Sequence, residues 1–334
     1  MKAAVYRKYG PPDVVQIEDV QKPVPKENEV LVKVRAASVN PLDWKVMSGG
    51  PYIIRTLLGL GKPKIRRPGV DVAGWVESVG RKVTQFKPSD EVFGTCRGAF
   101  AEYVCSSESR AVMKSVLVAK PENVTFEQAA SAPIAALTAL QGLRDKAHIQ
   151  AGQRVLINGA AGGVGTFAVQ IAKSFGAEVT GVCSTGNVDM VRSLGADHVI
   201  DYTQEDFTKS GQRYELFFDC VGNHPLLACR RVLTHKGRLI MVGAPDTARL
   251  TGLLVRLIGA LVLSRFVSQK MVPFLAKSHK EDLTLVGEFM ATGKVTPVIH
   301  KRYRLTEVAE ALWYLKEGHA RGKVVISVED TNQT

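Results

Sequence analysis

Long apolar runs and paired cysteines are missing from the sequence. No apolar stretch reaches the ~18 residues needed to cross a bilayer, and the nearest, Leu250–Leu263, is interrupted by Arg256 and two glycines. We interpret it as a buried or interface segment in preference to a membrane contact. The five cysteines show no CxxC spacing, which favours reduced thiols over a disulfide framework. Since the opening MKAAVYRKYG is typical of a strand, we expect a cytoplasmic protein without a membrane span.

Acidic residues are in deficit, and the net charge is +12 over 334 residues. Such a balance suits an anionic ligand or a nucleic acid. The basic residues are spread out, however, and gather only as pairs such as Arg66–Arg67 and Arg230–Arg231. We therefore interpret the charge as a solvated basic surface and expect no nucleic-acid partner.

Two kinds of pattern divide the chain. Residues 1–124 are rich in short β-branched runs separated by Pro and Gly, which predicts a small barrel-like sheet. From 151 to 243 strands alternate with helices, including a polar helix after His198–Asp201, which predicts a doubly wound parallel α/β sheet. We expect one domain from 1–124 with 268–334, and a second from 125–267. Thr125–Leu143 is then the first helix of the second domain, and Thr125 with Glu127 or Gln128 resembles its capping start. A sixth strand lies within 250–267.

A glycine turn follows the first strand of the second domain. Arg154–Gly165 reads RVLINGAAGGVG and runs directly into a helical pattern. Glycines between a strand and a helix let backbone N–H groups approach a pyrophosphate, and the helix N-terminus adds partial positive charge. The spacing departs from GxGxxG only in that Ala replaces the first glycine. We predict a dinucleotide site here rather than a glycine turn that serves only strand–helix packing. The residues predicted to form the site are Ala160, Gly162, Gly163, Val164 and Gly165.

The end of the second strand of this domain lacks a carboxylate. Sites for NAD place Asp or Glu there, on the ribose 2′-hydroxyl. This chain has Ser184, Thr185 and Asn187, and the first acid, Asp189, lies in the next helix. Small hydroxyl side chains can donate hydrogen bonds to a 2′-phosphate, so the sequence predicts NADPH. Alternatively, Ser184 and Thr185 cap the helix that follows.

Several motifs along the whole chain resemble the medium-chain dehydrogenase/reductase family, in its zinc-independent quinone oxidoreductase, zeta-crystallin-like and enone oxidoreductase branch. The motifs are VNPLDWK (39–45), PGVDVAGWVESVG (68–80), GAAGGVG (159–165), SLGADHVIDY (193–202), GRLIMVG (237–243) and HARGKVVI (319–326). The resemblance implies a doubly wound Rossmann domain beside a GroES-like barrel. Homodimers are common among such relatives, so it also implies a homodimer.

The resemblance also bears on metal chemistry. Zinc-dependent relatives carry a Cys ligand and a His ligand at positions that match Asn40 and Val70 here, and neither side chain is a usual zinc ligand. We therefore expect no metal. Hydride transfer to a quinone or to an α,β-unsaturated carbonyl remains feasible, because conjugation spreads the developing charge. The alternatives are an enoyl-thioester reductase and an NADPH-binding RNA-binding or structural protein.

For the substrate side, the resemblance implies three candidate catalytic residues. Asn40 donates an amide hydrogen bond to substrate or ribose, or is only a turn residue before Pro41. Lys45 stabilises the enolate or binds ribose, or is only solvated. Tyr52 contacts substrate, or only packs.

For the cofactor side, the resemblance adds residues along the second domain and one near the C-terminus. They are Thr138, Tyr202, Val221, Val242, Gly243, Ala244 and Lys323. Lys323 is expected to reach a cofactor phosphate. Relatives often have a basic residue where this chain has Gly186 and Asn187, which relaxes the preference for NADPH over NADH.

Overall fold

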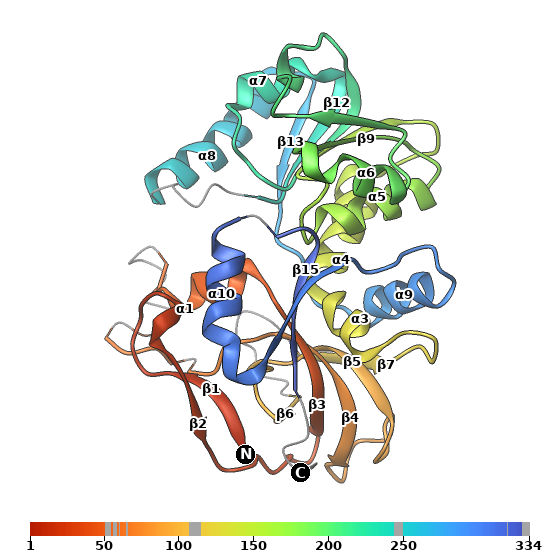
Figure 1. Cartoon of the computed structure of the whole chain (residues 1–334). Coiled ribbons are helices and arrows are strands. Elements are labelled where there is room, and N and C mark those ends of the chain that lie inside the picture. Colours follow the sequence, from red (N-terminus) through yellow and green to blue (C-terminus); the bar gives the residue numbers. More distant parts are fainter. Residues whose placement is uncertain are drawn as a thin grey trace. The chain divides into compact units, whose positions relative to one another are not determined.

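The computed structural model describes residues 1–50, 55, 59, 61–64, 66–106, 115–243, 250–318 and 320–328. The chain divides into two compact units. One is a barrel unit, Met1–Leu137 with Lys277–Thr334, and the other is a nucleotide-type unit, Thr138–Ala276. Figure 1 labels many of the elements of each unit.

The unit boundaries lie later in the chain than 125 and 268, at both ends of the second unit. Helix α3 (Phe126–Ser131) packs against the barrel strands β3, β4 and β15, so it belongs with the barrel. Its start is the expected capping box, in which Thr125 and Gln128 exchange side-chain and backbone hydrogen bonds. Strand β13 (Lys270–Pro273) pairs with β12 and therefore belongs with the second unit.

The barrel unit is built on a seven-stranded sheet in the order β14-β15-β3-β4-β5-β7, with β6 pairing β3, and on the hairpin β1-β2. Its strands are β1 (Lys2–Tyr6), β2 (Val15–Asp19), β3 (Val30–Val39), β4 (Asp71–Val79), β5 (Glu91–Thr95), β6 (Tyr103–Cys105), β7 (Val116–Ala119), β14 (Ile299–Arg304) and β15 (Lys323–Ser327). Its helices are η1 (Pro12–Val14), α1 (Pro41–Met47), α3, α9 (Lys280–Ala291), η6 (Leu305–Glu307) and α10 (Val308–Lys316), with α4 (Pro133–Gln141) at the unit boundary.

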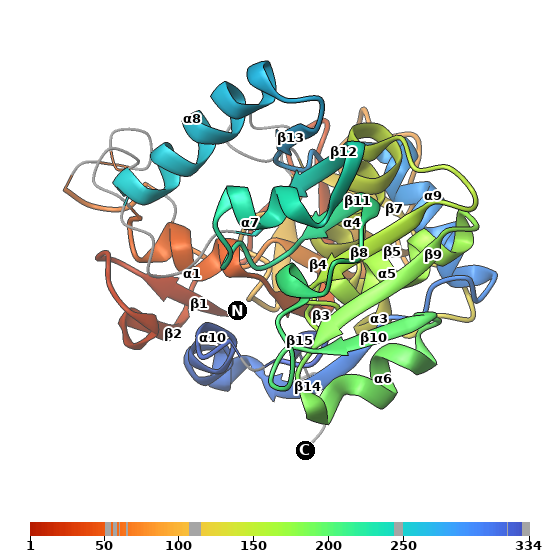
Figure 2. The same ribbon diagram turned by 90° about the horizontal axis from the view of Figure 1, so that it is seen from above.

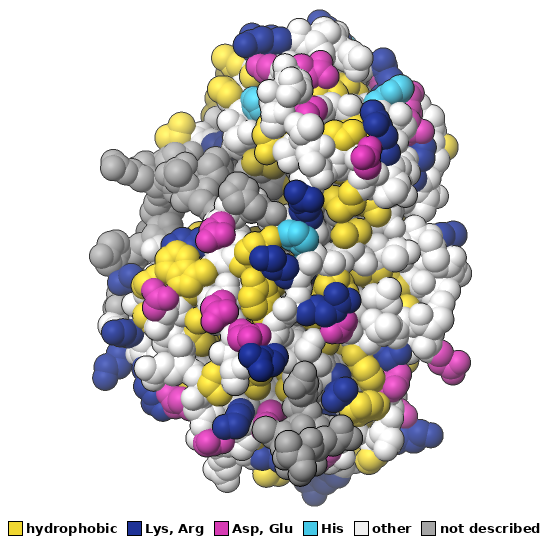
Figure 3. Space-filling view, in the orientation of Figure 1, with side chains coloured by type: hydrophobic (Ala, Val, Ile, Leu, Met, Phe, Trp, Pro, Cys, Tyr) yellow, Lys and Arg dark blue, Asp and Glu magenta, His cyan; other side chains and the backbone are white. Residues whose placement is uncertain are grey.

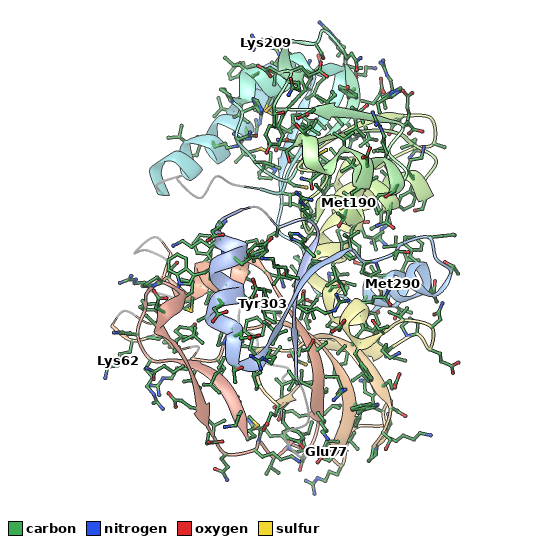
Figure 4. All side chains as sticks on the ribbon, viewed as in Figure 1. Lys62, Glu77, Met190, Lys209, Met290 and Tyr303 are labelled. Carbon is green, nitrogen blue, oxygen red and sulfur yellow. The ribbon has the colours of Figure 1, made fainter. Side chains whose placement is uncertain are left out.

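A buried apolar core fixes this barrel. Val32, Val72, Phe100 and Ile326 belong to one cluster and are fully or almost fully buried. On the outer side, Tyr303 of β14 points toward α10 (Figure 4), and its ring centroid lies 6.3 Å from that of Tyr314. The N-terminal and C-terminal parts of the chain thus share one core.

The second unit is a six-stranded parallel sheet in the order β10-β9-β8-β11-β12-β13. Its strands are β8 (Arg154–Asn158), β9 (Glu178–Cys183), β10 (His198–Asp201), β11 (Tyr214–Asp219), β12 (Leu233–Met241) and β13. Its helical segments are η3 (Gly142–Ala147), α5 (Gly165–Ser174), η4 (Thr185–Asn187), α6 (Val188–Ser193), η5 (Phe207–Lys209), α7 (Leu226–Arg231) and α8 (Leu250–Phe266). The strand order reverses at β8, which confirms the doubly wound topology.

Helices cover both faces of this sheet, as Figure 2 shows from above. Leu156, Phe217 and Leu239 face α7 and α8 in one buried cluster. On the opposite face, α5 packs against β8 and β9. Because each strand is buried on two sides, its sequence is apolar throughout rather than alternating.

Two expected elements are wrong. The segment 250–266 is the helix α8, and the sixth strand begins only at Lys270. The run holds six Leu residues, which favour a helix, against four β-branched residues. Between β10 and β11, where the structure describes every residue, the helical segment is the short 3-10 helix η5 and not an α-helix. Asp201 and Asp206 instead accept hydrogen bonds from the backbone N–H groups of Thr203 and Thr208, a local alternative to helix formation.

Across the described residues, no helix combines the length and the apolar character that crossing a bilayer requires.

Candidate active site

The glycine turn has the geometry of a phosphate site. The backbone N–H groups of Gly159 and Ala160 both donate to the Val182 carbonyl, at 3.1 and 3.0 Å, so the turn is tied to β9. Gly159 has φ of +79°, a conformation that favours glycine. Helix α5 begins at Gly165, and the Thr166 N–H donates to the Gly162 carbonyl at 3.0 Å. The turn therefore brings the N-terminal end of α5, where a helix leaves backbone N–H groups without intrahelical acceptors, to the carboxyl end of β8.

Gly165 and Ala160 fit this turn for opposite steric reasons. A Cβ on Gly165 would overlap the Gly159 carbonyl oxygen, so only glycine lets α5 start this close to β8. Ala160 replaces the usual glycine and is fully buried. Its methyl group faces Gly181 of β9, where an added Cβ would lie 3.1 Å away. The glycine at 181 thus makes room for the alanine at 160.

The end of β9 is a hydrogen-bonded polar corner. Asn187 Nδ2 donates to Ser184 Oγ at 2.9 Å, and the Asn187 N–H donates to the Ser184 carbonyl. Thr185 Oγ1 lies 2.9 Å from Thr203 Oγ1. Neither Ser184 nor Asn187 makes a side-chain cap to the helix that follows. Asn187 Oδ1 is buried and, within the described residues, unpartnered. A ligand hydroxyl would satisfy this acceptor.

Sequence reasoning missed Asp201, which the sheet brings to the same corner. Asp201 ends β10 and is in register with Cys183 at the end of β9. Hydrogen bonds from Thr185 and Thr203 hold the pKa of Asp201 below its usual value, so the carboxylate is charged. The corner therefore contains one negative charge, the carboxylate of Asp201 on the neighbouring strand β10. Tyr202 follows it and is 60% exposed.

Asp219 organises the end of β11. Its carboxylate is 1% exposed and accepts from Asn158 Nδ2 at 3.0 Å, from the Gly222 N–H at 2.9 Å and from the Val221 N–H at 3.2 Å. Arg256 of α8 completes it with an ion pair of 3.1 Å. The Asp219 carbonyl also accepts from the N–H groups after β12, those of Val242 and Gly243. Asp219 thus fixes two loops that the resemblance assigns to the cofactor, one through its carboxylate and the other through its backbone carbonyl.

In the barrel unit, Asn40 is fully engaged inside the protein. Its Nδ2 donates to Asp71 Oδ2 at 2.8 Å, and its Oδ1 accepts from Lys323 Nζ at 2.7 Å. Its backbone N–H donates to Asp43 at 2.7 Å, which caps α1. The side chain is 3% exposed. Asn40 therefore has no amide group left for a substrate, and the structure favours its alternative role as a turn and capping residue.

Lys323 also differs from its expected role. Its ammonium is buried and lies 3.7 Å from Asp71, besides its bond to Asn40. It is thus already paired within the barrel rather than extended toward a phosphate. Burial lowers the pKa of Lys323 and raises that of Asp71, while their mutual attraction opposes both shifts. Burial also raises the pKa of Asp43 to about 7, and the nearby Asp71 adds to this rise.

The remaining predicted residues lie in less informative places. Lys45 is on α1, with Nζ 5.6 Å from the ring centroid of Trp44. Thr138 lies in α4, the first residue of the second unit. Val221 is 38% exposed. Tyr52 and Ala244 lie outside the described residues.

These residues do not fit a catalytic zinc ion. At the two positions that match zinc ligands, Asn40 is bonded to Lys323 and Val70 has no donor atom. The adjacent Asp71 accepts from Ser38, Asn40 and the Ile134 N–H. A fixed ammonium beside this carboxylate opposes a second cation. In the described part of the chain, His, Cys, Asp and Glu form no group of three that could hold a metal.

Comparison with known proteins decides the family. Residues 26–116 match the alcohol dehydrogenase GroES-like domain, and residues 194–326 match the zinc-binding dehydrogenase family. The chain is 35% identical to a 2-methylene-furan-3-one reductase of Solanum lycopersicum over 341 residues, 98% of this chain and 79% of the relative. It belongs to the medium-chain dehydrogenase/reductase family. The family matched by residues 194–326 is named for zinc binding, but this chain has Asn40 and Val70 at the positions that match the zinc ligands.

Within the medium-chain dehydrogenase/reductases, the resemblance to the quinone and enone oxidoreductase branch is confirmed. An NADPH-dependent alkenal/one oxidoreductase of Arabidopsis thaliana chloroplasts is 35% identical, over 98% of this chain and 79% of that protein. The quinone oxidoreductase of Coxiella burnetii has a solved structure with a TM-score of 0.83, 30% identity and coverage of 98% and 99%. The expected Rossmann and GroES-like architecture is confirmed as well.

Proposed function

We propose that this protein is an NADPH-dependent oxidoreductase that transfers hydride to quinones or α,β-unsaturated carbonyls without a catalytic zinc. The observation that carries the proposal is the glycine turn at β8–α5 in a chain 35% identical, across 98% of its length, to relatives named as enone reductases. When bound, NADPH supplies the hydride.

The nucleotide-type unit supplies the binding groups for the cofactor. The N–H groups at the start of α5 bind the pyrophosphate, and Gly162 and Gly163 leave space for its close approach. The Asp219 carboxylate accepts from the N–H groups of Val221 and Gly222. The Asp219 backbone carbonyl accepts from those of Val242 and Gly243, so both stretches of backbone are fixed. We propose that these stretches, with Thr138, orient the nicotinamide.

The 2′-phosphate is proposed to bind at the corner formed by Ser184, Thr185 and Asn187. The hydroxyl groups of Ser184 and Thr185 are small donors on the surface of the unit. Asp201 lies beside them and repels an anion. We therefore propose that NADPH is preferred over NADH only moderately.

On the substrate side, we propose Lys45 as the donor to the developing enolate oxygen, on the resemblance of VNPLDWK to the family motif. A cation at that oxygen stabilises charge that is larger in the transition state than in the ground state. Asn40 is not proposed for this role because its amide is already bonded at both ends. Tyr52 stays a candidate from the sequence.

An NADPH-consumption screen tests the proposal. Purified protein, treated with a chelator and then freed of it, is assayed with enones, quinones, aldehydes and alcohols, with NADH in parallel. We expect turnover of enones or quinones that the chelator does not change. Complete loss of activity on chelation, restored by zinc, contradicts the proposal.

Replacing Gly162 tests the cofactor site directly. An added Cβ would lie 3.3 Å from the Gly159 carbonyl oxygen, a tight contact that a small shift relieves. Gly162→Asp therefore keeps the fold and places a carboxylate against the pyrophosphate. We expect NADPH binding to weaken at least about a hundredfold, measured by fluorescence titration. The matched control is Gly61→Asp, where an added Cβ meets nothing within 4 Å and the backbone φ is not positive. Equal NADPH affinity in Gly162→Asp and the wild-type protein refutes the assignment.

The homodimer and the cytoplasmic location stay predictions. The Arabidopsis relative is named as chloroplastic, which concerns that protein alone. Light scattering of the purified chain measures its mass in solution directly.

A further inference from the structure

Helix α8 has an uncovered apolar face. Its exposed side chains include Val255, Ile258, Leu261, Val262 and Phe266, which are between 52% and 83% exposed. At 3.6 residues per turn, these five fall within an arc of about 140°. We call them the α8 stripe. In Figure 3 apolar side chains reach the surface at the upper left, where Figure 1 places α8.

The opposite side of α8 packs against the nucleotide-type unit. Ala260 is fully buried, and Leu263 packs against the cluster that contains Cys229 and Leu239. Arg256 is paired with Asp219. The helix is therefore apolar on its inner and outer sides, which is typical of helices that have a second apolar neighbour. An exposed apolar patch of this kind marks an interaction surface.

The segment that carries the stripe is rich in basic residues. Between Cys220 and Ala276 the chain contains eight Lys or Arg residues and a single acid, Asp246, which lies outside the described residues. Arg265 falls within the arc of the stripe, and Lys270 follows it. Arg230 of α7 donates to Gln269 at 3.2 Å, which places it beside the C-terminal end of α8. Leu227, also on α7, is 63% exposed.

We propose that the α8 stripe and its flanking basic residues bind the surface of an anionic lipid bilayer, with α8 lying in the interface and not crossing it. Apolar side chains beside Arg and Lys are the pattern of interfacial helices. Each basic residue near an anionic surface strengthens binding about fivefold. A second copy of this chain suits the charge less well, because a two-fold interface would bring the same basic stretch face to face. A nucleic acid would leave the apolar stripe in water.

The test uses the full chain and two kinds of vesicle, phosphatidylcholine alone and phosphatidylcholine mixed with phosphatidylglycerol, in a sedimentation assay. We expect binding to the anionic vesicles, weak binding to the neutral ones, and a loss of binding as salt rises. The variant Leu261→Ser/Phe266→Ser should lower the affinity for anionic vesicles at least about tenfold. Its matched control is Val24→Ser, which changes an 81% exposed apolar residue of the barrel unit and should bind as wild type.

A second pair of variants separates local charge from net charge. Arg265→Glu/Lys270→Glu should abolish the preference for anionic vesicles. Lys87→Glu/Lys146→Glu carries the same change in net charge at exposed positions elsewhere and should keep it. Thermal unfolding confirms that each variant is folded. In a folded Phe266→Trp protein, brominated lipid should quench the added fluorescence.

Three results would overturn the proposal. One is equal vesicle binding by the wild-type protein and Leu261→Ser/Phe266→Ser. Another is a dimer that dissociates in this variant while vesicle binding is unchanged, which would assign the stripe to a second copy. The third is salt-sensitive RNA binding, lost in Arg265→Glu/Lys270→Glu, by a chain that binds neither type of vesicle.

Discussion

Replacing the buried carboxylate Asp43 by its amide should change how the stability of the protein depends on pH. Asp43 is 5% exposed and its pKa is raised to about 7 by burial. In the unfolded chain the same carboxyl titrates near about 3.9. Between these values the folded state binds a proton that the unfolded state has lost. The stabilisation is therefore complete at low pH and is lost as the pH rises through about 7.

The magnitude follows from the two pKa values. Each unit of difference corresponds to about 1.4 kcal/mol, so the free energy of unfolding should fall by about 2.5 kcal/mol from about pH 5 to about pH 8 through Asp43 alone. Asp43→Asn removes this term. It also replaces an oxygen that accepts from backbone N–H groups of Asn40 or Gly69. That loss costs about 1 kcal/mol, but equally at every pH.

Urea unfolding at a series of pH values measures the effect. The wild-type protein should lose about 2.5 kcal/mol more than Asp43→Asn over this range, because the histidines and other groups titrate alike in both. Asp13→Asn is a suitable control, since Asp13 is exposed at its position on η1. Parallel pH profiles for the wild-type protein and Asp43→Asn would refute the reasoning, whatever their difference in absolute stability.

Three further predictions concern Lys323, Asp201 and Lys45. Lys323→Met leaves Asp71 buried without its cation and should lower the free energy of unfolding by about 3–5 kcal/mol in urea titrations. Adding Asp71→Asn should restore much of it, and no recovery would contradict the pairing. Asp201→Asn should favour NADPH over NADH a few-fold in titrations, because it removes about 0.5–1 kcal/mol of repulsion; an unchanged ratio places the 2′-phosphate elsewhere. Lys45→Ala should lower kcat at least about tenfold with little change in NADPH affinity, and unaltered steady-state kinetics would return Lys45 to a surface role.

The features that could be predicted from the sequence are those that local pattern encodes. The glycine turn, the parallel strands and the capping box at Thr125 each depend on neighbouring residues, and each is found where it was expected. The apolar run of α8 alone does not distinguish a helix from a strand, because such a run has the periodicity of neither. Its six Leu residues are the helix signal that the sequence offers.

The polar contacts of the site could not be predicted because they join distant parts of the chain. Lys323 reaches Asn40 across 283 positions. Asp201 reaches the end of β9 only because β10 pairs with that strand in register. Motif spacing gives the identity of such residues but not their partners. For this reason the motif predicts a contact between Lys323 and a cofactor phosphate, although Lys323 is bonded to Asn40 inside the barrel unit.

The buried pairs around Asn40 give the barrel unit a rigid base for α1. Asn40 is bonded to Asp71 and Lys323 through its side chain and to Asp43 through its backbone, and Asp43 caps the helix that carries Lys45. Zinc-dependent relatives have metal ligands at the positions of Asn40 and Val70. This chain instead has a hydrogen-bonded network there, and the cation in the network is the ammonium group of Lys323. Such a cation cannot approach a substrate oxygen as a metal does, since Lys323 is buried and already paired. We therefore propose that Lys323 contributes to the reaction by fixing α1, and that Lys45 on that helix stabilises the enolate.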